Sequence, residues 1–131
     1  DYGKKIAASN GKVAVGGFCW GGAQTFRFAT NYKGAQAFLV FYGTGPEDAA
    51  VFKNIKAPVY GFYGGDDNRV NATIPASEKF MKAAKKKYEP VIYEGAGHGF
   101  MRSGQDPAGS EANKKARDAG FERMRQILSK M

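Results

Sequence analysis

The chain has 131 residues, of which 43% are hydrophobic, 14% aromatic and 24% charged; this composition fits one domain with a modest core and excludes a disordered chain. No apolar run approaches the ~20 residues of a membrane-spanning helix, so we expect no membrane partner. The formal net charge of +8 falls largely in two stretches with helical spacing, 79–87 and 114–130, and no nucleic-acid motif accompanies it; we therefore expect lysines that face solvent and no nucleic-acid partner.

Cysteine usage leaves the compartment undecided. Cys19 is the only cysteine, so it has no partner for an internal disulfide or for a cysteine-based metal site. No signal peptide is visible, and a cytoplasmic location is favoured. The sequence begins at Asp1 rather than Met, which leaves open that an N-terminal signal was removed.

Short apolar runs, several of them bounded by glycine, alternate with stretches of helical spacing. The runs predict strands, the first of them buried, at 12–18, 35–42, 58–63 and 90–93. The intervening patterns predict helices at 21–32, 47–55, 74–88 and 110–131, with a glycine-rich loop at 95–109. Alternation of this kind predicts an α/β fold with about four parallel strands and helices on both faces of the sheet.

A candidate nucleophile lies between the first strand and the first helix. Gly17-Phe18-Cys19-Trp20-Gly21-Gly22 is the pattern of a nucleophile elbow, with Cys in place of Ser. Such a turn is strained, so we expect close packing where glycines flank Cys19. The helix N-terminus that follows favours negative charge and would support a thiolate, and the backbone N–H of Trp20 would be one oxyanion donor. The alternative for this motif alone is a structural cysteine beside a glycine-rich turn.

A candidate acid and base follow later strands. Asp66 and Asp67 come directly after the third strand, and His98, the only histidine, comes after the fourth. The order Cys19, Asp67, His98 is the nucleophile–acid–base order of α/β-hydrolases, and all three would lie at the same end of a parallel sheet. His98 would take the thiol proton and an aspartate would orient the imidazole. Spacing alone does not separate Asp67 from Asp66.

Three motifs together resemble the dienelactone hydrolase (carboxymethylenebutenolidase) family, and the resemblance covers nearly the whole chain from about Gly11. They are Gly17-Phe18-Cys19-Trp20-Gly21-Gly22, Gly64-x-x-Asp67-x-x-Val70 and Gly97-His98-Gly99-Phe100. The resemblance selects Asp67 as the acid, three residues before the valine. It also implies that Arg102, four residues after His98, helps to hold a substrate carboxylate; the alternative is a surface arginine.

The resemblance implies hydrolysis of a small, anionic ester or lactone through a thioester acyl-enzyme, with no metal or organic cofactor. The family is about twice this long, so residues 1–131 are interpreted as a single partial domain, the C-terminal half of an α/β-hydrolase. The absent part would hold the first strands, a second oxyanion donor, a glutamate and a second arginine. We expect one edge of the strand before Cys19 to lack a partner and to be covered by that N-terminal half or by a second copy. The competing hypothesis is a non-catalytic binding or assembly module on the same scaffold.

Overall fold

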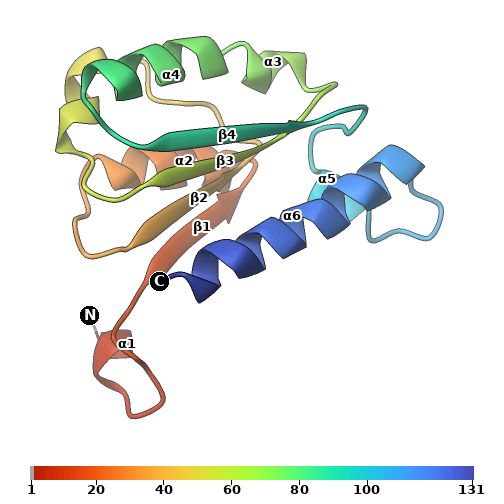
Figure 1. The fold of residues 1–131 in the computed structure, drawn as a ribbon. Helices are drawn as coiled ribbons and strands as arrows, with labels where there is room; N and C mark the ends of the chain where they lie inside the picture. The colour runs from red at the N-terminus through yellow and green to blue at the C-terminus, as the bar shows by residue number, and fades with distance from the viewer. Residues whose placement is uncertain (1) are drawn as a thin grey trace.

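A four-stranded parallel sheet forms the centre of the molecule. The computed structural model describes residues 2–131, and the strands lie in the order β1-β2-β3-β4, with all three pairings parallel (Figure 1). The strands are β1 (Ala14–Phe18), β2 (Ala37–Phe41), β3 (Val59–Gly64) and β4 (Tyr88–Tyr93). The predicted fold class is therefore confirmed.

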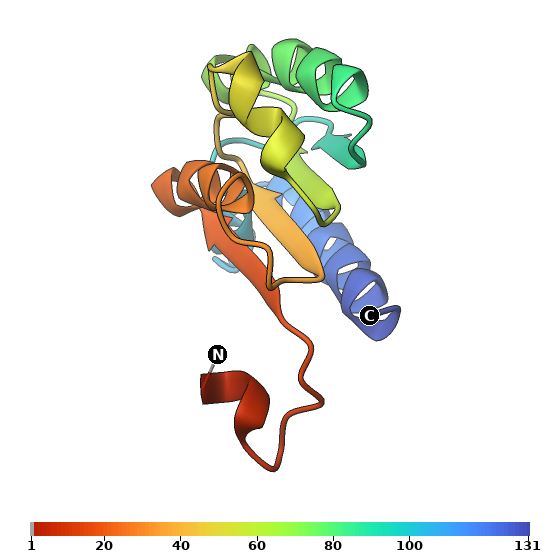
Figure 2. The same cartoon turned by 90° about the vertical axis from the view of Figure 1, so that its left-hand side faces the viewer.

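Helices cover both faces of this sheet. The longer ones are α2 (Trp20–Ala29), α4 (Ile74–Ala83) and α6 (Glu111–Ser129); the short ones are α1 (Tyr2–Lys5), the 3₁₀ helix η1 (Ala49–Asn54), α3 (Asn68–Asn71) and α5 (Phe100–Ser103). Figure 2 separates α2 and α6 on opposite sides of the strands. Neighbouring side chains of a strand point to opposite faces, which is why β2, whose five residues are all buried, supplies both cores.

The two cores use alternate residues of β2. Phe38 and Val40 pack with Phe26 of α2, whereas Leu39 and Phe41 pack with Phe100 of α5. Strand β1 differs, since Gly16 and Phe18 are exposed and none of its residues is fully buried. The sequence predicted a buried strand here. This detail is wrong because β1 is an edge strand whose one partner, among residues 2–131, is β2.

The boundary between α4 and β4 also differs from the prediction. The helix predicted to reach Tyr88 ends at Ala83, and Lys85 has a positive φ of 57°, which breaks helical geometry. Tyr88 instead begins β4, which starts two residues before the predicted Pro90. Its hydroxyl lies 2.6 Å from that of Tyr63, a tertiary contact that sequence periodicity does not contain.

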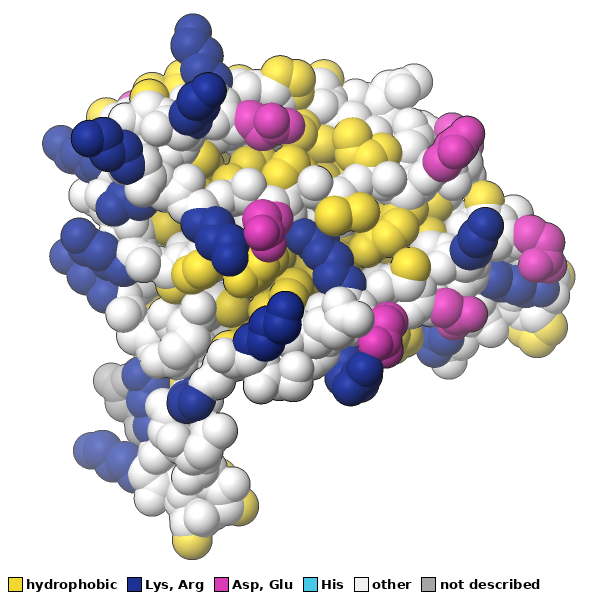
Figure 3. All heavy atoms as spheres, viewed as in Figure 1, with side chains coloured by type: hydrophobic (Ala, Val, Ile, Leu, Met, Phe, Trp, Pro, Cys, Tyr) yellow, Lys and Arg dark blue, Asp and Glu magenta, His cyan; other side chains and the backbone are white. Residues whose placement is uncertain are grey.

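Positive side chains lie on several parts of the visible surface. On the face seen in Figure 3, Lys and Arg side chains gather along the left-hand margin, and others lie near acidic side chains around an apolar tract at the centre of the view. No helix within residues 2–131 combines the length and apolarity required to cross a bilayer.

Candidate active site

Cys19 occupies the sharp turn between β1 and α2. Its backbone has φ 57° and ψ −122°, a conformation that costs a non-glycine residue energy and that occurs preferentially at functional sites. The turn is held on both sides. The Cys19 N–H donates to the Phe41 carbonyl at 3.1 Å, and the Cys19 carbonyl accepts from the N–H groups of Gly22 and Ala23. The Cys19 side chain is exposed.

Close packing at this turn requires two particular glycines. A Cβ on Gly17 would collide with the Gly21 carbonyl and lie 2.5 Å from Thr25 Oγ1, and a Cβ on Gly22 would collide with the Phe41 carbonyl. A Cβ on Gly21 meets nothing within 4 Å. The expected tight packing is thus present at Gly17 but absent at Gly21, and Gly22 is the second glycine that the close approach of α2 to the sheet requires.

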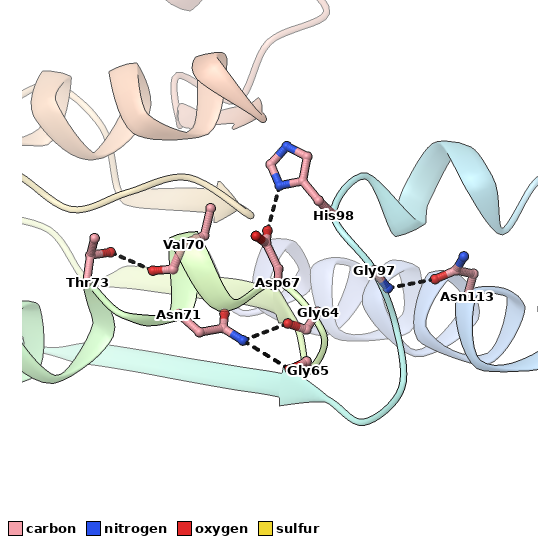
Figure 4. A network of polar contacts seen from close by, with 9 residues as sticks. All are labelled: Gly64, Gly65, Asp67, Val70, Asn71, Thr73, Gly97, His98 and Asn113. Carbon is pink, nitrogen blue, oxygen red and sulfur yellow. Dashed lines mark hydrogen bonds and ion pairs between the residues drawn. The ribbon is translucent and has the colours of Figure 1, made fainter.

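Asp67 and His98 are joined directly. His98 Nδ1 lies 2.5 Å from Asp67 Oδ2, and the Asp67 side chain is only 7% exposed. Figure 4 shows the second ring nitrogen of His98 pointing away from Asp67. Asp66 is exposed, and its backbone N–H donates to the Ala96 carbonyl at 2.9 Å. Of the two candidate carboxylates, the structure therefore brings Asp67 to the imidazole and uses Asp66 to link the loops that carry them.

Two asparagines tether the loops behind this pair (Figure 4). Asn113 of α6 accepts a 2.9 Å hydrogen bond from the backbone N–H of Gly97, next to His98. Asn71 of α3 donates a 2.8 Å bond to the Gly64 carbonyl at the end of β3. Because α3 and α6 are anchored in the fold, these bonds fix the backbone on both sides of the Asp67–His98 pair.

Cys19 and His98 line one cavity of 710 Å³. The other residues of its wall are Phe18, Tyr42, Gly99, Met101, Arg102, Ser103 and Asp106. Within the described part of the chain, the hydrogen bond of the imidazole goes to Asp67, and none joins it to the Cys19 thiol. Catalytic hydrogen bonds are often long in unligated enzymes and shorten when substrate binds, so the shared cavity is the relevant geometry.

The remaining predicted residues also lie at this cavity or at its turn. Arg102 is exposed on α5 and forms part of the cavity wall. Trp20 is the first residue of α2, so its backbone N–H precedes the first intrahelical hydrogen bond and has no partner within the helix. The indole ring itself is 77% exposed.

Tyr42 is a cavity residue that the sequence reasoning missed. It follows β2 directly, as Cys19 follows β1, and it precedes Gly43. This position at the carboxyl end of a strand was the available signal. Burial raises the pKa of the Tyr42 hydroxyl to about 12, with a further contribution from the nearby Cys19 and a smaller, opposing one from a hydrogen bond with the Met101 backbone.

Volume alone does not identify the site. A larger hollow of 880 Å³ lies between β4 and α6, but the residues that line it include no cysteine, histidine or serine. We choose the smaller cavity as the candidate site by its chemistry, because the Cys19 thiol and the His98 imidazole both line it and the imidazole is bonded to the buried Asp67 carboxylate. No cluster of three potential metal ligands occurs in residues 2–131.

The chain is similar to known proteins over most of its length. A family model described as the dienelactone hydrolase family matches residues 2–131. A protein of Saccharolobus solfataricus, named as a candidate carboxymethylenebutenolidase, is 32% identical over 120 residues, covering 92% of this chain and 45% of that protein.

Two solved structures have similar folds. A candidate dienelactone hydrolase of Klebsiella pneumoniae superimposes with a TM-score of 0.75 at 25% identity, over 90% of this chain and 52% of that one. A dienelactone hydrolase-like promiscuous phosphotriesterase from metagenomic libraries gives a TM-score of 0.80 at 26% identity, over 96% of this chain and 55% of that one. The chain thus spans about half the length of these relatives, and it belongs to the dienelactone hydrolase family.

Proposed function

We propose that this chain carries the reacting groups of an ester or lactone hydrolase that uses Cys19 as its nucleophile. The observation that carries the proposal is the single cavity wall shared by the Cys19 thiol and by an imidazole whose Nδ1 lies 2.5 Å from a buried carboxylate. Membership of the dienelactone hydrolase family supports the same reaction class.

The proposed reaction has two halves. His98 removes the proton from Cys19, and the thiolate attacks the substrate carbonyl carbon. The resulting oxyanion accepts a hydrogen bond from the Trp20 N–H, and collapse of the tetrahedral intermediate breaks the ester C–O bond as His98 returns the proton to the leaving oxygen. Water, deprotonated by His98, then hydrolyses the Cys19 thioester and releases the acid. Asp67 holds the imidazole in the tautomer with its proton on Nδ1.

The proposed substrate is a small ester or lactone that carries a negative charge. Arg102 lies on the cavity wall, and a guanidinium binds a carboxylate through two parallel hydrogen bonds. The proposed steps use protein groups and water alone. A lactone ring would remain attached to Cys19 as an open-chain thioester, whereas an ester would lose its alcohol in the first half.

A second candidate is a non-catalytic binding or assembly module. The exposed edge of β1 favours it, because β1 pairs only with β2 among the described residues and its last residue, Phe18, is 48% exposed. An unpaired edge beside the nucleophile offers backbone groups to a partner strand, as the N-terminal half of a hydrolase or a second copy would provide.

The deciding experiment is hydrolysis of p-nitrophenyl acetate by the purified chain, compared with Cys19→Ala. We expect a burst of p-nitrophenol, an acetyl group on the peptide that contains Cys19, and loss of both in the variant. The variant has no cysteine, so iodoacetamide should label the parent chain once and the variant not at all. Activity that survives Cys19→Ala would overturn the proposal, and a folded chain that neither labels nor turns over would favour the binding module. A charged lactone and a phosphotriester complete the substrate series.

A further inference from the structure

Cys19 and Tyr42 occupy equivalent positions on neighbouring strands. Phe18 and Phe41, which precede them, are paired in the β1–β2 register. Cys19 and Tyr42 each add one hydrogen bond to the sheet beyond the end of their strands. The Cys19 N–H donates to the Phe41 carbonyl, and the Tyr42 N–H donates to the Phe62 carbonyl at 2.8 Å. Both residues have a positive φ, 57° at Cys19 and 38° at Tyr42.

The strained backbone at Tyr42 directs its ring to the imidazole. The Tyr42 and His98 ring centroids are 5.1 Å apart with an interplanar angle of 63°, an edge-to-face geometry that is favourable between aromatic rings. Phe100 supports the tyrosine from another side at 5.2 Å. Tyr42 is only 2% exposed, so its ring is a fixed wall, whereas the His98 side chain is 38% exposed.

We propose that Tyr42 is a positioning residue, whose ring confines the His98 imidazole to the orientation that keeps Nδ1 on Asp67 and the second ring nitrogen open to the cavity of Cys19. A single hydrogen bond at Nδ1 leaves the imidazole free to tilt about that bond. The ring of Tyr42 removes this freedom by occupying the space into which the imidazole would swing. The proposal deepens, and rests on, the hydrolase function proposed above.

The hydroxyl of Tyr42 contributes less than the ring to the positioning of His98. Its pKa of about 12 keeps it protonated at neutral pH, so it neither takes the thiol proton nor adds a negative charge beside a thiolate. The positioning role therefore resides in the ring. This distinguishes Tyr42→Phe, which keeps the ring, from Tyr42→Leu, which removes it.

The test reads His98 directly by NMR, which the chain permits because His98 is its only histidine. The probe is the low-field Nδ1–H resonance of the imidazole in the unligated protein, together with the nitrogen shifts that report the tautomer. We expect the resonance in the parent chain and in Tyr42→Phe, and its broadening or loss in Tyr42→Leu. Tyr93→Leu is the matched control, because Tyr93 also packs on Phe100, at 5.3 Å, but does not line the cavity of Cys19.

Kinetics provide the second measurement. Displacement of a catalytic group by about 1 Å costs on the order of 10²-fold, so we expect Tyr42→Leu to lower kcat by about 10- to 100-fold while KM changes little, and Tyr42→Phe to keep most of kcat. An unchanged Nδ1–H resonance and an unchanged kcat in a folded Tyr42→Leu protein would overturn the proposal. So would equal losses in Tyr93→Leu. If the leucine variant does not fold, Tyr42→Met removes the ring with an unbranched side chain and is judged by the same criteria.

The NMR result is independent of turnover. If Cys19→Ala retains hydrolysis, the proposed function fails whatever Tyr42 does. If Cys19→Ala is inactive but the Nδ1–H resonance of His98 is the same in the parent and ring-less proteins, the positioning role fails while the hydrolase function stands.

Discussion

Asp67 Oδ2 and His98 Nδ1 lie 2.5 Å apart, although 31 residues separate them in the sequence and they follow two different strands. The contact depends on the loops themselves, since the backbone N–H of Asp66 bonds to the carbonyl of Ala96. One aspartate therefore contributes its carboxylate to the imidazole, and its neighbour contributes its backbone to the loop geometry.

Because the two aspartates have different contacts, isosteric substitution of each should affect activity differently. Asp67→Asn should lower kcat by about 10³- to 10⁴-fold, because an amide at this position no longer fixes the productive imidazole tautomer. Asp66→Asn should leave kcat nearly unchanged, since the exposed side chain is not what links the loops. Hydrolysis of p-nitrophenyl acetate measures both, with circular dichroism to verify folding. Equal effects of the two substitutions would contradict the assignment of Asp67.

Asn113 offers a test of how the His98 loop is held. Asn113→Ala removes the acceptor of the Gly97 N–H bond and should lower the free energy of unfolding by about 1 kcal/mol, the usual net value of one hydrogen bond. It should also lower kcat, because the freed backbone carries His98. Asn113→Asp keeps an acceptor oxygen and should restore much of both values. Urea unfolding and esterase assays read the two effects, and a stable Asn113→Ala protein with full activity would show that the tether is dispensable.

The fold was predictable because the strands are short apolar runs with a glycine within two residues of their carboxyl ends, and parallel strands place those ends at one edge. Cys19, Asp67 and His98 could therefore be placed near one another from strand order alone. Asp67 could be chosen over Asp66 only by resemblance to the family motif, since both spacings reach the histidine. The structure supplied the contact itself.

What the sequence could not supply depends on tertiary contacts. The end of α4 was placed five residues too late because Tyr88 also satisfies the helical spacing, and its hydroxyl contact with Tyr63 is long-range. The predicted loop at 95–109 contains α5, whose start follows Gly99 in the left-handed conformation, with φ 79°. Gly22 rather than Gly21 proved to be the tightly packed glycine after Cys19, a difference that depends on how closely α2 approaches β2.

Gly21 and Gly22, which follow Cys19 in α2, provide a matched pair of stability tests. Gly22→Ala places a Cβ against the Phe41 carbonyl and 3.2 Å from the Gly17 carbonyl and Gly43 Cα. We therefore expect the free energy of unfolding to fall by about 1–3 kcal/mol, the usual cost of overpacking. Gly21→Ala places its Cβ in open space and should be neutral or stabilise the helix by roughly 0.5–1 kcal/mol. Urea midpoints of the two variants make the comparison. A Gly22→Ala protein as stable as Gly21→Ala would show that α2 can move away from the sheet at little cost.

Alkaline pH should weaken the fold through the buried tyrosines. Burial raises the pKa of Tyr63 to about 12, and burial, together with the neighbouring Tyr63 hydroxyl, raises that of Tyr88 as well. The pKa of an unfolded tyrosine is about 10. Between about pH 10 and 12 the folded chain therefore holds protons that the unfolded chain has released. The stabilisation is complete below about pH 10 and is lost as the pH rises towards 12, by up to about 1.4 kcal/mol per pH unit for each such tyrosine.

Urea unfolding from pH 8 to 11 measures this slope, and Tyr63→Phe/Tyr88→Phe should reduce it. Part of the slope should remain, because burial also raises the pKa of Tyr42 to about 12. The double replacement removes both hydroxyls of the 2.6 Å pair, so it leaves no buried hydroxyl without its partner and should cost little near neutral pH. Tyr63→Phe alone leaves the Tyr88 hydroxyl without this partner and should destabilise the protein at pH 8 more than the double variant does. Tyr2→Phe is the control, because Tyr2 is 83% exposed and its replacement should leave the slope unchanged. If the double variant keeps the full parental slope, other groups cause the loss of stability at alkaline pH and Tyr63 and Tyr88 do not.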